Sequence, residues 1–312
     1  MGTDDLNVLI KARALCKKRV RAFFDARSVA EVDAPALQPF AVTDLHIDCM
    51  RVDFAGITNY LQSSPEYFMK RLLCAGSGDI YSLAFAYRDG EKGHRHHPEF
   101  LMLEWYRLDW DEQRLMTEVA DLLAYLGIAV ADVQTLDYGT FFESETGLNP
   151  HSCETVELQA CAGEIAGTDY SEELRNICLD MIFSLKLEPQ LPEGLVFVHN
   201  YPACQSALAT VVEDAAGHPV ARRFEAFIDR MEIANGYFEL TDSEALRQRF
   251  GHDNKLRQLA GKPKIAIDER LLSAMQTGLP QCAGVALGLD RVLMKLLGCE
   301  RIEEVMLEGW LD

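Results

Sequence analysis

The 312-residue sequence lacks an uninterrupted apolar run of the roughly 18 residues that a membrane-spanning helix needs. It is also short of positive charge: 30 Lys and Arg residues stand against 49 Asp and Glu residues, which gives a net charge of −19. Nucleic-acid-binding proteins neutralise phosphates with a basic surface, so this balance argues against a nucleic-acid partner. The first residues are acidic, unlike a secretory signal, and we expect a cytoplasmic protein.

The nine cysteines form no Cys-x-x-Cys pair, and the sequence shows no internal repeat or low-complexity tract. An odd number of scattered cysteines in apolar contexts indicates reduced, buried thiols, as in cytoplasmic proteins. His94, His96 and His97 stand close together, but no Cys or His cluster at ligand spacing accompanies them, so we expect no zinc site. With 48% hydrophobic residues, the chain can bury a large core, and its length allows one large domain or two small ones.

The most informative segment covers residues 85–106. An apolar stretch leads through Arg88 and a charged, His-rich turn into an alternating strand, in which Phe100 and Glu104 share one face. This pattern predicts an antiparallel hairpin. A second segment, residues 284–294, predicts an apolar strand that opens into a helix with Arg291 at its start. Two arginines next to strands of an acidic protein suit the clamping of a triphosphate.

The remaining pattern predicts an α+β protein. Pro65 is expected to open a helix over 66–74, and a turn at residues 229–230 would bring Glu225 and Glu232 together on adjacent strands. Thr241 and Glu244 have the spacing of a capping box for a helix over 241–258. The other expected elements are helices at 6–27 and 111–126, extended segments at 31–37, 80–87, 196–200, 223–230 and 232–240, and short helices between 132 and 192.

These segments resemble the catalytic core of the class II aminoacyl-tRNA synthetases, most closely the lysyl enzyme. Residues 85–106 are similar to motif 2, residues 284–294 to motif 3 and residues 31–37 to motif 1. The blocks 64–70 and 232–240 also match, in the family's order. Within this family the chain is similar to the short paralogues that attach β-lysine to elongation factor P.

The resemblance implies an antiparallel sheet flanked by helices in a single catalytic core over 1–312, with a helical insertion at 132–192. Motif 1 begins so early that we expect no anticodon-binding OB domain. It also implies a homodimer, built around motif 1, that uses ATP and Mg²⁺. Such an enzyme joins the substrate carboxylate to the α-phosphate of ATP, and catalysis consists of positioning and charge neutralisation.

The resemblance assigns roles to individual residues. Arg88 and Arg291 are the expected catalytic residues, and Glu225 and Glu232 the expected Mg²⁺ ligands. The expected ATP-binding residues are Arg88, Asp89, Gly90, His96, His97, Phe100, Glu232, Ile233, Gly288 and Arg291. The expected substrate-binding residues are Ser64, Pro65, Glu66, Glu104, Tyr106, Asn235, Tyr237, Glu239 and Ala286.

Each assignment competes with an ordinary structural role. Arg88 could form a surface ion pair with Asp89 or Glu91, Phe100 could be a core aromatic, and the acids could be exposed. Carboxylates crowded into one pocket are unfavourable unless cations arrive, so a diamine such as lysine is the expected guest.

Three positions depart from the lysyl enzymes. Gly90 stands where they have glutamate, His97 where they have asparagine, and Ala286 where they have glycine. One methyl group in a tight pocket discriminates by roughly 1–3 kcal/mol. We therefore expect Ala286 to crowd an α-amino acid and to favour β-lysine.

The leading hypothesis is an ATP-dependent ligase that forms a β-lysyl adenylate and transfers the lysyl group to a lysine ε-amine of elongation factor P. A lysyl-adenylate former with another acceptor, including tRNA, is the first alternative, although the net charge makes tRNA an unfavourable partner. A catalytically silent paralogue that senses an amino acid is the second, and Gly90 is the feature that favours it. The sequence leaves open the acceptor residue and the identity and stereochemistry of the lysine.

Overall fold

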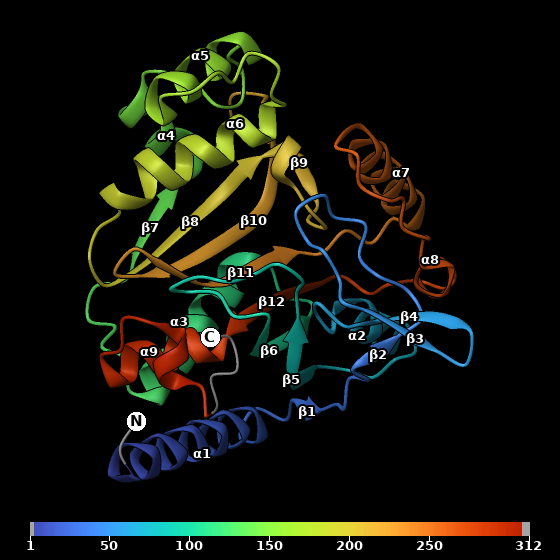
Figure 1. Ribbon diagram of the computed structural model, residues 1–312, viewed down its shortest axis with the longest axis vertical. Helices are drawn as coiled ribbons and strands as arrows, with labels where there is room; N and C mark the ends of the chain where they lie inside the picture. The colour runs from blue at the N-terminus through green and yellow to red at the C-terminus, as the bar shows by residue number, and fades with distance from the viewer. Residues whose placement is uncertain (1–2, 308–312) are drawn as a thin grey trace. The chain divides into compact units, whose positions relative to one another are not determined.

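The computed structural model describes residues 3–307, which divide into two compact units (Figure 1). Unit 1 comprises Met1–Trp110, Leu122–Ile128 and Leu240–Asp312, and unit 2 comprises Asp111–Asp121 and Ala129–Glu239. Helix α3 (Glu112–Leu126) is shared between them. None of the helices within residues 3–307 combines the length and the apolar character that crossing a membrane requires.

The strands of unit 1 form two sheets. In the first, the order is β1-β5-β6-β12; β1 pairs with β5 in parallel, and the other pairs are antiparallel. The second is a small antiparallel sheet with the order β2-β4-β3. The strands are β1 (Ala30–Glu31), β2 (Leu37–Gln38), β3 (Arg51–Phe54), β4 (Ile57–Leu61), β5 (Ile80–Tyr87), β6 (Glu99–Leu108) and β12 (Cys282–Gly288).

The first sheet of unit 1 is packed against the N-terminal helix. Phe24 of that helix stacks on Tyr81 of β5 and meets Trp105 of β6 edge-on, and all three side chains are buried. Arg13 forms a buried ion pair with Asp290, at 2.6 Å, which ties the same helix to the start of α9. The helices of unit 1 are α1 (Thr3–Asp25), α2 (Glu66–Cys74), α7 (Ser243–Leu259), α8 (Glu269–Gln276), α9 (Leu289–Leu297) and a 3₁₀ turn at Ile302–Val305.

The strands and helices of unit 2 surround their own apolar core. The strand order is β11-β10-β8-β7, with β9 beside β10, and only the β7–β8 pair is parallel. Helices α4, α5 and α6 lie together beside β7 and β8 and bury an apolar core against them (Figure 1). The elements are β7 (Gln134–Asp137), β8 (Leu195–Pro202), β9 (Val211–Glu213), β10 (Pro219–Ile228), β11 (Met231–Phe238), α4 (Tyr138–Thr146), α5 (Thr155–Ala166), α6 (Arg175–Ile182), a π-helical turn at Phe183–Leu187 and 3₁₀ turns at Glu188–Gln190 and Ala203–Gln205.

Several local predictions can be compared directly with these elements. The helix expected after Pro65 spans Glu66–Cys74, and the strand expected at 80–87 is β5, so both are confirmed. The segment 132–192 contains the short helices α4–α6 and also strand β7. The predicted cap of α7 is wrong: Asp242, not Thr241, precedes the helix, and its carboxylate accepts hydrogen bonds from the amides of Glu244 and Ala245. A carboxylate caps an N-terminus at least as well as a hydroxyl does.

Candidate active site

The hairpin predicted for residues 85–106 is formed by β5 and β6, which pair in register from Ile80–Tyr106 to Tyr87–Glu99. Arg88 lies where β5 ends, and its backbone amide donates to the carbonyl of Pro98, closing the loop. Its guanidinium lies 5.1 Å from the centre of the Phe100 ring and 3.4 Å from a carboxylate oxygen of Glu91. The structure therefore brings Arg88 and Phe100 together, and it also shows the ion pair that competes with a phosphate for Arg88.

One face of β6 is bordered by small residues on both neighbouring strands. Glu104 lies opposite Ser82 of β5 and Ala286 of β12. Directly opposed residues project from the same side of a sheet, so the neighbouring strands place a hydroxymethyl and a methyl group beside this side chain. Met102 likewise lies between two small residues, Ala84 and Gly288, whereas Tyr106 lies between Ile80 and Gly284.

The predicted amine-binding residues of unit 1 form one hydrogen-bond network. Ser64 donates from Oγ to Glu104 at 2.8 Å, and the Tyr106 hydroxyl donates to the other oxygen of Glu104 at 2.7 Å. The backbone amide of Glu66 donates to Ser64 Oγ at 3.0 Å. The network thus links the first turn of α2, just after Pro65, to strand β6.

Arg291 reaches the loop of the β5–β6 hairpin from the opposite end of the chain. It lies in the first turn of α9, and its Nε donates to the backbone carbonyl of Arg95 at 3.1 Å. That carbonyl precedes His96, which is exposed, so Arg291 and His96 border the same part of the loop. His97 is buried instead, and its Nδ1 lies 2.7 Å from the carbonyl oxygen of Glu99.

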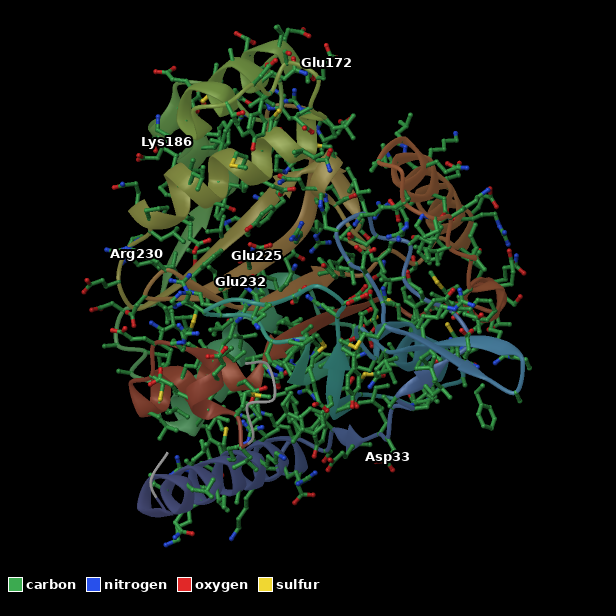
Figure 2. The ribbon with its side chains drawn as sticks, in the orientation of Figure 1. Asp33, Glu172, Lys186, Glu225, Arg230 and Glu232 are labelled. Atoms are coloured by element: carbon green, nitrogen blue, oxygen red, sulfur yellow. The ribbon has the colours of Figure 1, made fainter. Side chains whose placement is uncertain are left out.

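The predicted metal ligands of unit 2 lie on the hairpin of β10 and β11 (Figure 2). The predicted turn at Asp229 and Arg230 is present, and both residues have positive φ angles, as tight hairpin turns require. Glu225 lies opposite Asn235, whereas Glu232 lies opposite Phe227, with a register shift between the two pairs. This bulge inserts one extra residue into β11, and it places Glu232 on the same face as Glu225 and Asn235.

Arg223 contacts several side chains on this face, although no pattern in the sequence selects it. Its guanidinium donates to Glu225, to the side-chain oxygen of Asn235 and to the carbonyl of Gln205. Glu225 also accepts a hydrogen bond from Tyr201 at 2.7 Å. Burial raises the pKa of Glu225 to about 7; the positive charge of Arg223 opposes this shift, and the negative charge of Glu232 adds to it.

The family of class II tRNA synthetases for Asp, Lys and Asn matches residues 1–307. The chain belongs to the class II tRNA synthetase family. The predicted fold class, an α+β catalytic domain, and the prediction of a ligase of this type are therefore confirmed.

Individual relatives show which members of the class II family this chain is similar to. An elongation factor P–(R)-β-lysine ligase of Pasteurella multocida is 42% identical over 310 residues, which cover 97% of this chain and 94% of the relative. Proteins with the same name from Mannheimia succiniciproducens and Erwinia tasmaniensis are also 42% identical, over 304 and 303 residues. These alignments cover 95% and 94% of this chain, and 93% and 92% of the relatives. The predicted similarity to the short paralogues of the class II lysyl enzyme is confirmed.

Gly90 stands where the lysyl members of the class II family have glutamate, and its backbone conformation favours glycine. Its φ is +76°, a conformation that glycine adopts freely and a glutamate would adopt only with strain. Glu91, the residue after Gly90, contacts Arg88. Asp89 is exposed, and its amide donates to the carbonyl of Asp48. At Gly288, an added Cβ would make only ordinary contact with Arg291, so packing does not by itself require glycine there.

The carboxylates of Glu225 and Glu232 in unit 2 are the candidate ligands of a magnesium ion. Within residues 3–307 no group of three or more Asp, Glu, His or Cys side chains is arranged to hold a metal, so protein ligands alone would not surround the ion. Two carboxylates nevertheless suit Mg²⁺, which commonly takes one or two from the protein and its other ligands from phosphate and water. Burial is the main cause of the raised pKa of Glu225, and the negative charge of Glu232 adds to it; a divalent cation would relieve that repulsion. The residues therefore fit the ion.

The remaining predicted residues of unit 2 have different surroundings. Ile233 is buried and forms the extra residue of the bulge. Tyr237 lies opposite Arg223, and Glu239 is buried next to Thr210, whose hydroxyl donates to the Glu239 carbonyl. The roles of these residues stay predictions.

Two residues of unit 1 were missed. Lys70 is buried and contacts Glu66, and Ser82 lies beside Glu104 with a buried hydroxyl that has no hydrogen-bond partner within the described chain. The spacing of Glu66 and Lys70, four residues apart on a helix, was a usable signal. The sequence contains no such signal for Ser82, because its position beside Glu104 depends on the register between β5 and β6.

Proposed function

We propose that the chain activates β-lysine with ATP and transfers the β-lysyl group to a lysine ε-amine of elongation factor P. The relatives that cover nearly the whole chain at 42% identity carry the name of this activity. The observation in the structure that supports it best is the network of Ser64, Glu66, Glu104 and Tyr106, which presents carboxylates for the ammonium groups of a diamine.

The first step would join the substrate to ATP. A carboxylate oxygen of β-lysine attacks the α-phosphorus, the bond to the β-phosphate oxygen breaks, and pyrophosphate leaves. Arg88 would bind the reacting carboxylate and α-phosphate, because its planar fork can contact two anionic oxygens. Arg291 would bind the γ-phosphate, with His96 beside it, and Phe100 would stack on adenine. Glu225 and Glu232 would hold Mg²⁺, which neutralises phosphate charge when it is bound.

The second step would transfer the lysyl group. The acceptor ε-amine, once it has lost a proton, attacks the acyl carbon of the adenylate. AMP leaves with the bonding electrons, and the nitrogen loses a second proton to solvent as the amide forms. The net charge of −19 makes a protein acceptor more favourable than tRNA. We also propose that the active form is a homodimer built around motif 1, residues 31–37.

The amino-acid specificity is tested by pyrophosphate exchange with a panel that includes β-lysine, α-lysine and ornithine. We expect exchange with β-lysine well above that with α-lysine. Exchange with none of these amino acids would contradict the proposal and would leave the silent paralogue as the remaining hypothesis.

The acceptor is tested separately, with purified elongation factor P and with tRNA in the presence of ATP and labelled β-lysine. We expect label on elongation factor P alone, and label on tRNA alone would overturn this part of the proposal. A variant of elongation factor P that lacks the modified lysine is the control. Molecular mass in solution, measured by light scattering, tests the homodimer.

A further inference from the structure

Lys70 is the feature of the amine-binding network that the proposed mechanism does not use. Its side chain is only 1% exposed, and its Nζ lies 2.7 Å from Glu66 Oε1, one helical turn earlier on α2. A lysine is almost never buried this completely unless its charge is paired. The neighbouring buried positions of α2 are Met69 and Leu73, so packing alone would be met by an apolar residue.

The two carboxylate oxygens of Glu66 have different surroundings. Lys70 takes Oε1, and no hydrogen bond from another described residue reaches Oε2. The carboxylate is 18% exposed, so the second oxygen is not sealed in the core. The backbone of Glu66 is held as well, because its amide donates to Ser64 Oγ.

We propose that Lys70 is a positioning residue, which holds the Glu66 carboxylate in one rotamer so that Oε2 receives the substrate amine nearest the reacting carboxylate. This inference rests on the proposed function, because it takes Glu66 as the partner of that amine. It adds a specificity determinant that does not itself touch the substrate. A long carboxylate side chain has several rotamers, and a fixed ammonium removes that freedom before the substrate arrives.

The test compares two ligands that differ by one amine. β-Lysine is 3,6-diaminohexanoate, and 6-aminohexanoate lacks only the amine that Glu66 would bind. The ratio of the inhibition constant of 6-aminohexanoate to the KM of β-lysine, both from pyrophosphate exchange, measures how strongly the protein uses that amine. In Lys70→Met we expect this ratio to fall about tenfold, which corresponds to about 1.4 kcal/mol. The change should arise from a higher KM for β-lysine, with kcat and the inhibition constant of 6-aminohexanoate nearly unchanged.

Three further variants separate positioning from a structural role. Lys70→Arg keeps the positive charge and should retain most of the ratio, and Lys70→Gln, which keeps a donor without charge, should lie between it and Lys70→Met. Arg71→Met is the matched control, because it breaks another ion pair of α2, with Asp268, and does not contact Glu66. We expect it to leave the ratio unchanged. In a Glu66→Gln background, Lys70→Met should produce no further fall.

The outcomes distinguish this inference from the proposed function. If Lys70→Met and Lys70→Gln change both constants in parallel, or leave the ratio unchanged while exchange continues, Lys70 is structural and the inference is overturned. If the unmodified protein exchanges with neither β-lysine nor α-lysine, the proposed function itself fails. Should Lys70→Met not fold, the ratio in Lys70→Gln decides the question.

Discussion

Ala286 lies directly opposite Glu104 in the ladder of β12 and β6, so its methyl group projects beside the carboxylate from the same face of the sheet. This relationship supports the expectation that Ala286 shapes the amine-binding side of the site. We predict that Ala286→Gly raises kcat/KM for α-lysine relative to β-lysine by roughly 10- to 100-fold, because one methyl group discriminates by about 1–3 kcal/mol. Pyrophosphate exchange with both amino acids measures the ratio.

Ala283 provides the control for that substitution. It lies on the same strand, three residues earlier, and it is opposite Arg107 on the other face. Ala283→Gly should therefore reduce stability in a similar way without changing the preference between the two lysines. An unchanged preference in Ala286→Gly would refute the proposed role of the methyl group.

Ser82 offers a prediction in which stability and binding move in opposite directions. Its buried hydroxyl has no partner within residues 3–307, and a buried polar group left unsatisfied costs about 1–3 kcal/mol. We predict that Ser82→Ala raises the melting temperature and weakens β-lysine binding, because the variant loses a hydroxyl that is placed to contact the substrate beside Glu104. Ser64→Ala is the comparison, because that hydroxyl is already bonded, and its loss should lower both stability and affinity. Calorimetry and KM measurements distinguish the two patterns.

Arg291 gives a prediction about ATP. Its contact with the carbonyl of Arg95 uses the backbone, so the side chain of Arg95 should matter little for holding Arg291 in place. We predict that Arg291→Met lowers kcat/KM for ATP by on the order of 100-fold, as expected for a preorganised charge at a phosphate. Arg95→Met should reduce it far less. Equal losses in the two variants would show that the loop, rather than the Arg291 guanidinium, carries the effect.

Much of the fold could be predicted because local signals were strong. Alternation over 100–105 indicated β6, and a proline at residue 65 indicated the start of α2. The cap of α7 was misassigned because Thr241 and Asp242 are both good capping residues, and only the backbone geometry decides between them.

The site was less predictable where it depends on register and burial. The bulge in β11 places Glu232 on the same face as Glu225. It is defined by the pairing of β10 and β11, and no residue type in the segment predicts it. The sequence placed Glu66 and Lys70 one helical turn apart, but it could not show that the pair is buried. Arg223 was missed because its partners, Glu225, Asn235 and Gln205, come from separate segments.

The last prediction concerns acid stability near motif 1. Glu31 accepts hydrogen bonds from Arg21 and, at 2.9 Å, from the Tyr81 hydroxyl. The bond from Arg21 lowers the pKa of Glu31, burial opposes the shift, and Tyr81 lowers it further. Because the folded-state pKa lies below the unfolded value of about 4.3, the contribution is fully present above that value and is lost as the pH falls through the folded pKa.

We therefore predict that Glu31→Gln is less stable than the unmodified protein at pH 7, by less than about 1 kcal/mol, because Arg21 is half exposed and solvent screens the pair. The difference should shrink below about pH 4. Urea midpoints measured from pH 7 down to the acid limit of the folded state test this, and added salt should reduce the difference at pH 7. Arg51→Met, which breaks an exposed pair with Asp53, is the control for a general effect of removing an ion pair. A gap that stays constant with pH would show that Glu31 contributes by packing rather than by charge.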